Sequence, residues 1–211
     1  MRKNKTVIIS IVLILCLFTL FSCTTTAKWQ DQYSDTDSGK NVSVDPVNPS
    51  AKYIVFAALN SAGNLITRPA EGEPEATTAY AVVGYTGLVA ELVVPSTYNS
   101  LPVTKVLVAS PYSDYYCYRD GAAYTGNDAR LANQTVVTSI VFGSNVARIG
   151  EGVCNSMINL ASVTFSRSVT LEDYAFLNCG ALASVGGTYA WGSATASSTA
   201  FFGCTFNPAG A

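Results

Sequence analysis

The chain has 211 residues, with 12 Lys and Arg against 14 Asp and Glu, and it contains no histidine. A chain without a basic stripe is not expected to bind nucleic acid. The missing histidine removes the commonest general base and a common zinc ligand. Only 12% of the residues are charged, while Ser, Thr, Ala, Gly and Val are frequent, which favours strands and turns. We therefore expect a β-rich protein without enzymatic activity, metal or cofactor.

Residues 1–22 have the pattern of an export signal. Arg2, Lys3 and Lys5 precede an uncharged apolar run over 7–21, which is shorter than the roughly 20 residues of a bilayer span. The run ends in LFSC, from Leu20 to Cys23, which resembles the lipobox of bacterial lipoproteins. We therefore predict that Cys23 is the lipid-attachment residue. An ordinary secretory signal or an uncleaved anchor remains the alternative.

The next segment, residues 23–50, is polar and rich in Ser, Thr, Asp and Asn, without a hydrophobic period. Such composition is typical of a flexible linker. Together with the lipidated cysteine it predicts a domain held at a membrane surface by acyl chains.

A β segment is predicted over 51–87. YIVFAAL, residues 53–59, is typical of a buried strand followed by an NSAG turn, and Gly84 and Gly87 bound a second strand. Between them lies an acidic loop with Glu71, Glu73 and Glu75. A solvated turn explains these carboxylates better than a calcium site, because no ordered set of oxygen ligands accompanies them.

A repeat of 22–23 residues occupies residues 88–211. LASVTF, from Leu160 to Phe165, is followed by Val169, Leu171 and the phrase AFLNC, and the same skeleton begins at Val137, at Leu182 and, more divergently, at Val89. In VTF, alternate side chains point to opposite faces, so Val163 and Phe165 are predicted to point inward and Thr164 outward. One such unit cannot bury its apolar side, but stacked copies form a continuous core.

These residues carry a family resemblance. LVVPSTYNSLPVTKV (92–106), VTSIVFGSNVARIGEG (137–152) and LASVTFSRSVTLEDYAFLNC (160–179) resemble the BspA-like leucine-rich repeats of bacterial surface antigens. The resemblance implies a short leucine-rich-repeat solenoid, with one strand and one short helical turn per repeat and the segment 51–87 as an N-terminal β cap. It also implies a position at the outer membrane or cell surface, where the predicted lipid on Cys23 would hold the domain.

Cys179 and Cys204 hold the same repeat position and are predicted to stack. Two buried thiols and a disulfide are both compatible with this spacing, and we favour the thiols because the resemblance implies that this repeat position is a core position.

Two surfaces are candidates for ligand contact. The first is the outward side of the repeat strands, where the side chains are small and suit a broad protein contact. The second is the segment 111–124, which interrupts the repeats with several tyrosines, a residue type favoured in recognition; the same rings, however, also suit packing against the repeats. The candidate contact residues are Glu91, Ser139, Val141, Ser162 and Thr164 on the strands and Tyr112, Tyr115, Tyr116 and Tyr118 in the loop.

The sequence thus predicts a cell-envelope lipoprotein that acts as a protein-binding or adhesion module, with proteins or glycans of a host or neighbouring cell as partners. A structural or accessory lipoprotein of the periplasm is the alternative.

Overall fold

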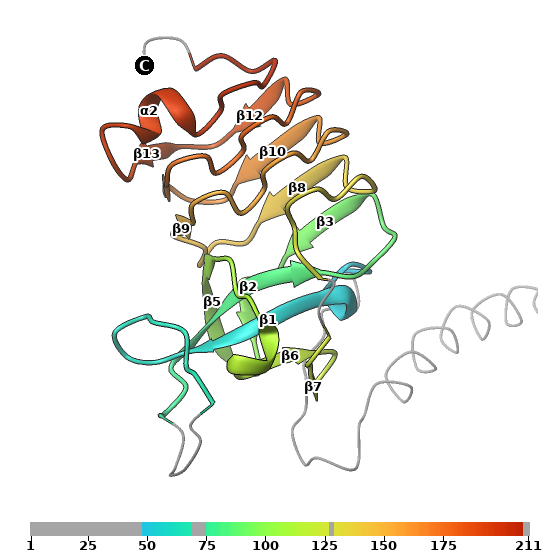
Figure 1. Ribbon diagram of the computed structural model, residues 1–211, viewed down its shortest axis with the longest axis vertical. Helices are drawn as coiled ribbons and strands as arrows, with labels where there is room; N and C mark the ends of the chain where they lie inside the picture. Colours follow the sequence, from blue (N-terminus) through green and yellow to red (C-terminus); the bar gives the residue numbers. More distant parts are fainter. Residues whose placement is uncertain (1–47, 69–74, 127–128, 209–211) are drawn as a thin grey trace, which may run out of the picture. The chain divides into compact units, whose positions relative to one another are not determined.

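The computed structural model describes residues 48–68, 75–126 and 129–208. It shows a β-rich protein with a β-solenoid of about five turns and little helix. The turns stack from β3 toward the C-terminal end of the described chain (Figure 1). Among the described residues, no helix is long and apolar enough to span a bilayer.

One side of the solenoid is a four-stranded parallel sheet. Equivalent repeat positions pair across it without a shift, so that Ser162 lies opposite both Ser139 and Ser184. This register confirms the predicted alignment of the repeats. The strands run in the spatial order β12 (Ser184–Gly186), β10 (Ser162–Phe165), β8 (Ser139–Phe142) and β3 (Glu91–Val94).

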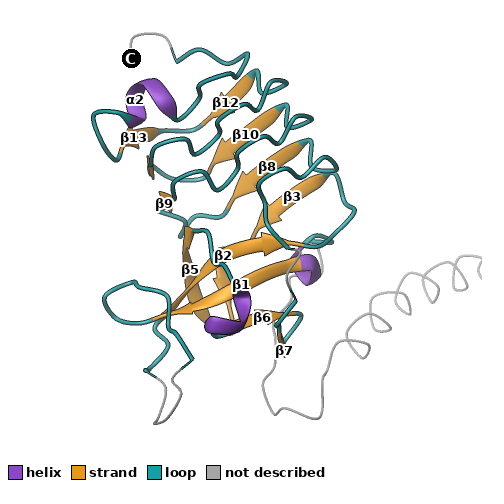
Figure 2. Ribbon diagram, in the orientation of Figure 1, coloured by secondary structure: helices purple, strands orange, loops and turns teal. Residues whose placement is uncertain are grey.

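Strands of a second sheet, which pair in parallel within the solenoid, form the next side of each turn (Figure 2). The sequence pattern predicted one strand per repeat, but the residues expected only to fill a middle layer form strands as well. Leu171 pairs with both Ile149 and Trp191, and Ile149 pairs with Val106. These strands are β5 (Leu101–Val106), β9 (Arg148–Ile149), β11 (Val169–Leu171) and β13 (Tyr189–Trp191), and the two-residue strand β4 (Thr97–Tyr98) folds back on β5.

The third side consists of turns rather than the predicted helical turns, apart from the four-residue helix α2 (Ala196–Thr199). Backbone hydrogen bonds join these turns across successive repeats. The N–H of Cys154 donates to Ala175 O at 2.9 Å, and the N–H of Phe176 donates to Ala200 O at 2.8 Å. Stacking therefore satisfies backbone groups that an isolated turn leaves to solvent.

Apolar side chains from the three sides meet inside the solenoid. Val163 and Phe165 are buried while Thr164 is exposed, as the alternation predicted. Phe142 and Phe165 stack with ring centroids 5.5 Å apart. Repetition at a fixed offset thus places like rings over one another and gives the continuous core that a single repeat lacks.

A second, smaller core lies beside β1 (Ile54–Leu59) and β2 (Ala79–Tyr85). Both strands lie in the predicted β segment, and they pair in antiparallel fashion, while β2 continues the second sheet by pairing in parallel with β5. The inserted segment after β5 returns to this sheet, since β6 (Cys117–Arg119) pairs with β1. It also contains the single-turn helix η2 (Tyr112–Asp114) and the short strand β7 (Ala122–Ala123).

The predicted linker 23–50 extends too far. Asn48 and Ser50, just before the single-turn helix η1 (Ala51–Tyr53), are buried polar residues that hydrogen-bond to Val93 of β3. Their side chains occupy the edge of β3 and therefore belong to the folded unit. The signal 1–22, Cys23, and the carboxylates Glu71 and Glu73 lie outside the described residues.

Candidate functional site

The strand face, defined here as the outward positions of β3, β8, β10 and β12, forms two registered rows. Glu91 and Thr164 are exposed, and Ser139, Val141 and Ser162 are half-buried. Most of these side chains are small and uncharged, so the surface suits a broad, shallow contact with a protein better than a small molecule. The rows are Glu91, Ser139, Ser162, Ser184 and Val93, Val141, Thr164, Gly186.

The tyrosines of the inserted segment 111–124 differ in how deeply they are buried. Tyr112 is only 2% exposed, and its hydroxyl donates to Val83 O at 3.1 Å. Its ring meets Tyr124 edge-on at 5.5 Å. The prediction that Tyr112 contacts a ligand is therefore wrong, because burial in the smaller core leaves it no free surface.

The other loop tyrosines retain partial exposure. Arg68 holds two of them, since its Nε donates to Tyr115 O at 2.9 Å and its guanidinium lies 5.4 Å from the ring centroid of Tyr116. Tyr118 packs edge-on against Tyr80 at 6.2 Å, and burial raises the pKa of its hydroxyl. Tyr115 and Tyr116 thus remain available for contact while being fixed by the neighbouring chain.

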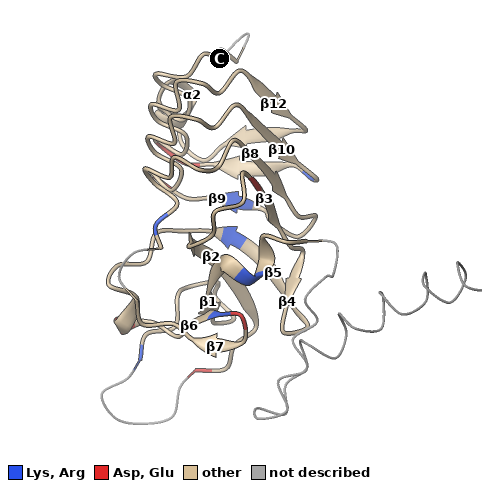
Figure 3. Ribbon diagram, turned by 90° about the vertical axis from the view of Figure 1, so that its right-hand side faces the viewer, with Lys and Arg blue, Asp and Glu red and all other residues tan. Residues whose placement is uncertain are grey.

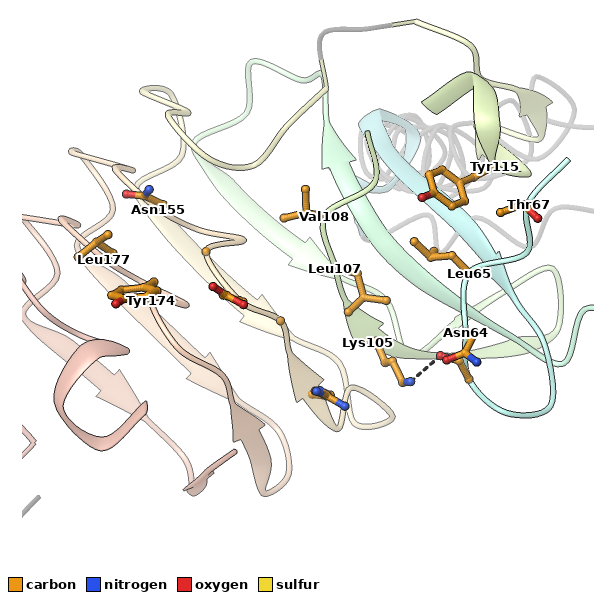
Figure 4. A pocket seen from close by; sticks show the side chains of 15 residues that line it. Asn64, Leu65, Thr67, Lys105, Leu107, Val108, Tyr115, Asn155, Tyr174 and Leu177 are labelled. Atoms are coloured by element: carbon orange, nitrogen blue, oxygen red, sulfur yellow. Dashed lines mark hydrogen bonds between the residues drawn. The ribbon is translucent and has the colours of Figure 1, made fainter. Parts of the chain in front are cut away.

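An open groove of about 980 Å³ lies beside Tyr115, a feature that sequence reasoning missed (Figure 4). One wall is the chain after β1, with Leu65 and Thr67, and the floor contains Leu107 and Val108 after β5. The opposite wall is made by turns of the solenoid, including Tyr174 and Leu177. The groove therefore spans both cores, which explains why no local sequence pattern indicated it.

Exposed apolar side chains line much of this groove. Val108 is 51% exposed and Tyr174 is 42% exposed, and Leu107 and Leu177 are half-buried. Large apolar side chains left in solvent around a concave surface are typical of interaction sites rather than of packing. The arrangement suits the side chains of a polypeptide partner.

Charged groups also line the groove. Lys105 and Arg148 lie opposite one another on the adjacent strands β5 and β9, and Figure 3 marks a basic residue on each of these strands. The Lys105 ammonium donates to Gly63 O at 2.5 Å, and Arg148 Nε lies 2.9 Å from Glu172 Oε1. Both cations are therefore held in place by the chain, and with Glu151 they give the groove a charged lining of both signs.

Tyr174 has an unfavourable backbone conformation for its residue type. Its φ is 60°, whereas the equivalent residue of the preceding turn is Gly152 with φ 62°. A bulky residue in this left-handed region carries strain of about 1–3 kcal/mol, and such strain is found most often at functional positions. The chain thus places a large aromatic ring in the groove where glycine would fit with less strain.

The described residues offer no arrangement suited to metal chemistry, because no three His, Cys, Asp or Glu side chains among them converge. Glu75, the one described carboxylate of the acidic loop, accepts a hydrogen bond from Asn60 Nδ2 at 2.6 Å. Comparisons with protein-family models, curated proteins and solved structures found no match to this chain. The geometry of the groove and of the strand face therefore carries the functional argument.

Proposed function

We propose that this protein is a lipid-anchored envelope protein whose repeat domain binds extended segments of other proteins. The groove carries the proposal, because it presents exposed apolar side chains and backbone-fixed polar groups along a concave surface. An extended polypeptide supplies both kinds of partner, with side chains for the apolar lining residues and peptide groups for the polar ones. The flat strand face is a second contact area of the same binding module.

The repeats belong, in this proposal, to the BspA-like leucine-rich class. Support comes from the 22–23-residue period and from the registered stacking of equivalent positions. The segment 51–87 then acts as the N-terminal cap of the solenoid, a role supported by the parallel pairing of β2 with β5. A capping element covers an apolar end that would otherwise be open to solvent.

Attachment through Cys23 is supported by the LFSC motif and by the charged and apolar segments before it. An anchored binding domain fits an outer-membrane or cell-surface adhesin with protein or glycan partners on a host or neighbouring cell. The alternative is an accessory lipoprotein whose binding partner lies in the periplasm. The two differ only in the side of the envelope on which the groove is exposed.

Protease treatment of intact cells distinguishes these locations. Wild type is compared with Cys23→Ala, and a known periplasmic protein reports envelope leakage. Cleavage of wild type with an intact periplasmic control supports the surface adhesin. Protection until the envelope is opened overturns the adhesin and leaves the periplasmic alternative. Loss of membrane association in Cys23→Ala tests the lipid anchor itself.

Binding is tested by selecting random linear peptides on the purified protein and measuring their affinity for groove variants. Leu177→Ala is expected to weaken selected peptides by about tenfold, since a groove contact of this size contributes about 1–2 kcal/mol. Leu88→Ala, the same substitution at a residue that is 84% exposed and does not line the groove, is the matched control. Peptides that bind both variants as tightly as wild type would show that the groove is not the site.

A further inference from the structure

Cys179 and Cys204 occupy equivalent places in consecutive solenoid turns. The N–H of Cys179 donates to Phe176 O at 3.3 Å, and the N–H of Cys204 donates to Phe201 O at 3.1 Å. Phe176 and Phe201 themselves stack with ring centroids 5.4 Å apart and planes inclined by 6°. The two cysteines therefore end the same local turn, one above the other.

The backbone next to the cysteines sets the distance between them. Asn178 N–H donates to Phe202 O at 2.7 Å, and Phe176 N–H donates to Ala200 O at 2.8 Å. Chains joined by such bonds lie about 4.8 Å apart. A disulfide spans Cα separations of about 4.4–6.8 Å, and the spacing of hydrogen-bonded turns falls within this range.

Both cysteines are free thiols in the structure, and the two thiols are in contact, while the Cys179 thiol also donates to Cys154 O at 2.9 Å. Cys204 Sγ lies 3.0 Å from Phe176 O, so its side chain points toward the turn that holds Cys179. Contact with the Cys179 thiol lowers the pKa of Cys204, and the same contact, together with burial, raises the pKa of Cys179. Cys204 is partly exposed and Cys179 is buried, so an oxidant in solution meets Cys204 first.

We infer that Cys179 and Cys204 form a disulfide that joins the last two turns of the solenoid. A disulfide in solution, such as oxidised glutathione or a thiol oxidoreductase, supplies the oxidant. The Cys204 thiolate attacks one of its sulfurs, forms a mixed disulfide and releases the first thiol. Cys179 then loses its proton and attacks the Cys204 sulfur, releasing the second thiol. Two protein thiols become one disulfide, and the external disulfide is reduced to two thiols.

The other two described cysteines, Cys154 and Cys117, are less well placed to form this disulfide. Cys154 is equivalent to Phe176 rather than to Cys179, and complete burial raises its pKa to about 12. Cys117 lies in the smaller core on β6, where burial raises its pKa to about 11. The disulfide rests on exposure to an oxidising medium but not on peptide binding, so either inference can fail without the other.

Trypsin provides a direct measurement. Residues 168–211 contain no Lys or Arg, so Cys179 and Cys204 fall in one peptide and Cys154 in another. The purified full chain is incubated with oxidised glutathione, alkylated in denaturant and digested. The expected result is an unalkylated peptide lighter by two hydrogen atoms, which gains two alkyl groups after reduction. A peptide that carries two alkyl groups without reduction overturns the inference.

Two variants locate the bond. In Cys204→Ser, Cys179 has lost its partner, so the 168–211 peptide is expected to carry one alkyl group without reduction. Cys154→Ser is the matched control and is expected to form the disulfide as wild type does. Closing a loop of this length is expected to raise the melting midpoint of the oxidised wild type by roughly 10 °C over the reduced form. A bond that pairs Cys179 with Cys154 in the wild-type digest would also overturn the assignment.

Discussion

The hydroxyl of Ser50 accepts a hydrogen bond from the N–H of Val93 at 2.9 Å, although 43 residues separate them in sequence. Asn48 completes the contact, because its Nδ2 donates to Val93 O at 2.6 Å and its Oδ1 accepts from Ser50 Oγ at 2.7 Å. Two side chains thus replace a neighbouring strand at the edge of β3. Covering an edge in this way removes a template for pairing with other chains.

Ser50→Ala is expected to lower the free energy of unfolding by about 1–2 kcal/mol, because the Val93 N–H loses its acceptor, the Ser50 hydroxyl, and Asn48 Oδ1 keeps only the Ser50 N–H. Urea denaturation measures the change. Ser113→Ala is the matched control, since the Ser113 hydroxyl is exposed and contacts only the adjacent Asp114. Equal midpoints for the two variants would mean that the Ser50 hydroxyl does not support β3.

Phe176 and Phe202 offer a test of the solenoid core with the same substitution at two sites. Phe176 is fully buried between aromatic neighbours, so Phe176→Ala is expected to cost about 3–5 kcal/mol. Phe202 is 66% exposed, and Phe202→Ala is expected to change stability by less than about 0.5 kcal/mol. Chemical denaturation compares them, and similar losses would contradict the inward and outward assignment of the two rings.

The sequence predicted the parts of this fold that depend on local periodicity. The alternation at Val163 and Phe165 set which side chains are inside, and the fixed offset set the register of β8 and β10. The inserted segment was different, because its pairing with β1 and the burial of Tyr112 depend on residues far away in the chain. No local signal marked Asn48 or Ser50 as part of the domain, since their partners lie on β3.

The groove was missed for the same physical reason. Leu65, Val108 and Tyr174 are unremarkable one by one and come from three separate parts of the chain. The strand face was easier to predict, because one repeat contains its whole pattern. A signal for Tyr174 did exist in the alignment of the repeats, where a large aromatic residue stands at the position that Gly152 fills in the preceding turn.

Tyr174→Gly is expected to raise the stability of the fold and to weaken peptide binding. Glycine accepts φ near 60° without strain, so the variant is expected to gain about 1 kcal/mol in unfolding free energy. The groove loses its exposed ring at the same time, so peptides selected on wild type are expected to bind about tenfold more weakly. Melting curves and peptide titrations on one preparation measure both quantities. A loss of stability, or unchanged peptide affinity, would contradict the functional account of this residue.

The hydrogen bonds to the Asp173 carboxylate lead us to expect that the stability of the fold depends on pH. Its carboxylate accepts hydrogen bonds from Ser193 Oγ at 3.0 Å and Thr199 Oγ1 at 3.1 Å, which join the turn after β11 to the next one. Hydrogen bonding from Thr195, with smaller contributions from Ser193 and Thr199, lowers its pKa below the ordinary value of 3.8.

A carboxylate with a lowered folded-state pKa stabilises the fold fully above its unfolded pKa, and that contribution is lost as the pH falls through the folded value. Wild type is therefore expected to lose stability as the pH drops below about 4. Asp173→Asn removes the titrating group, so the variant is expected to be less stable near neutral pH and to lose less on acidification. Urea midpoints from about pH 7 to about pH 3 measure the difference. Parallel pH profiles for the two proteins would show that the hydrogen bonds to Asp173 do not couple the last two turns to its ionisation.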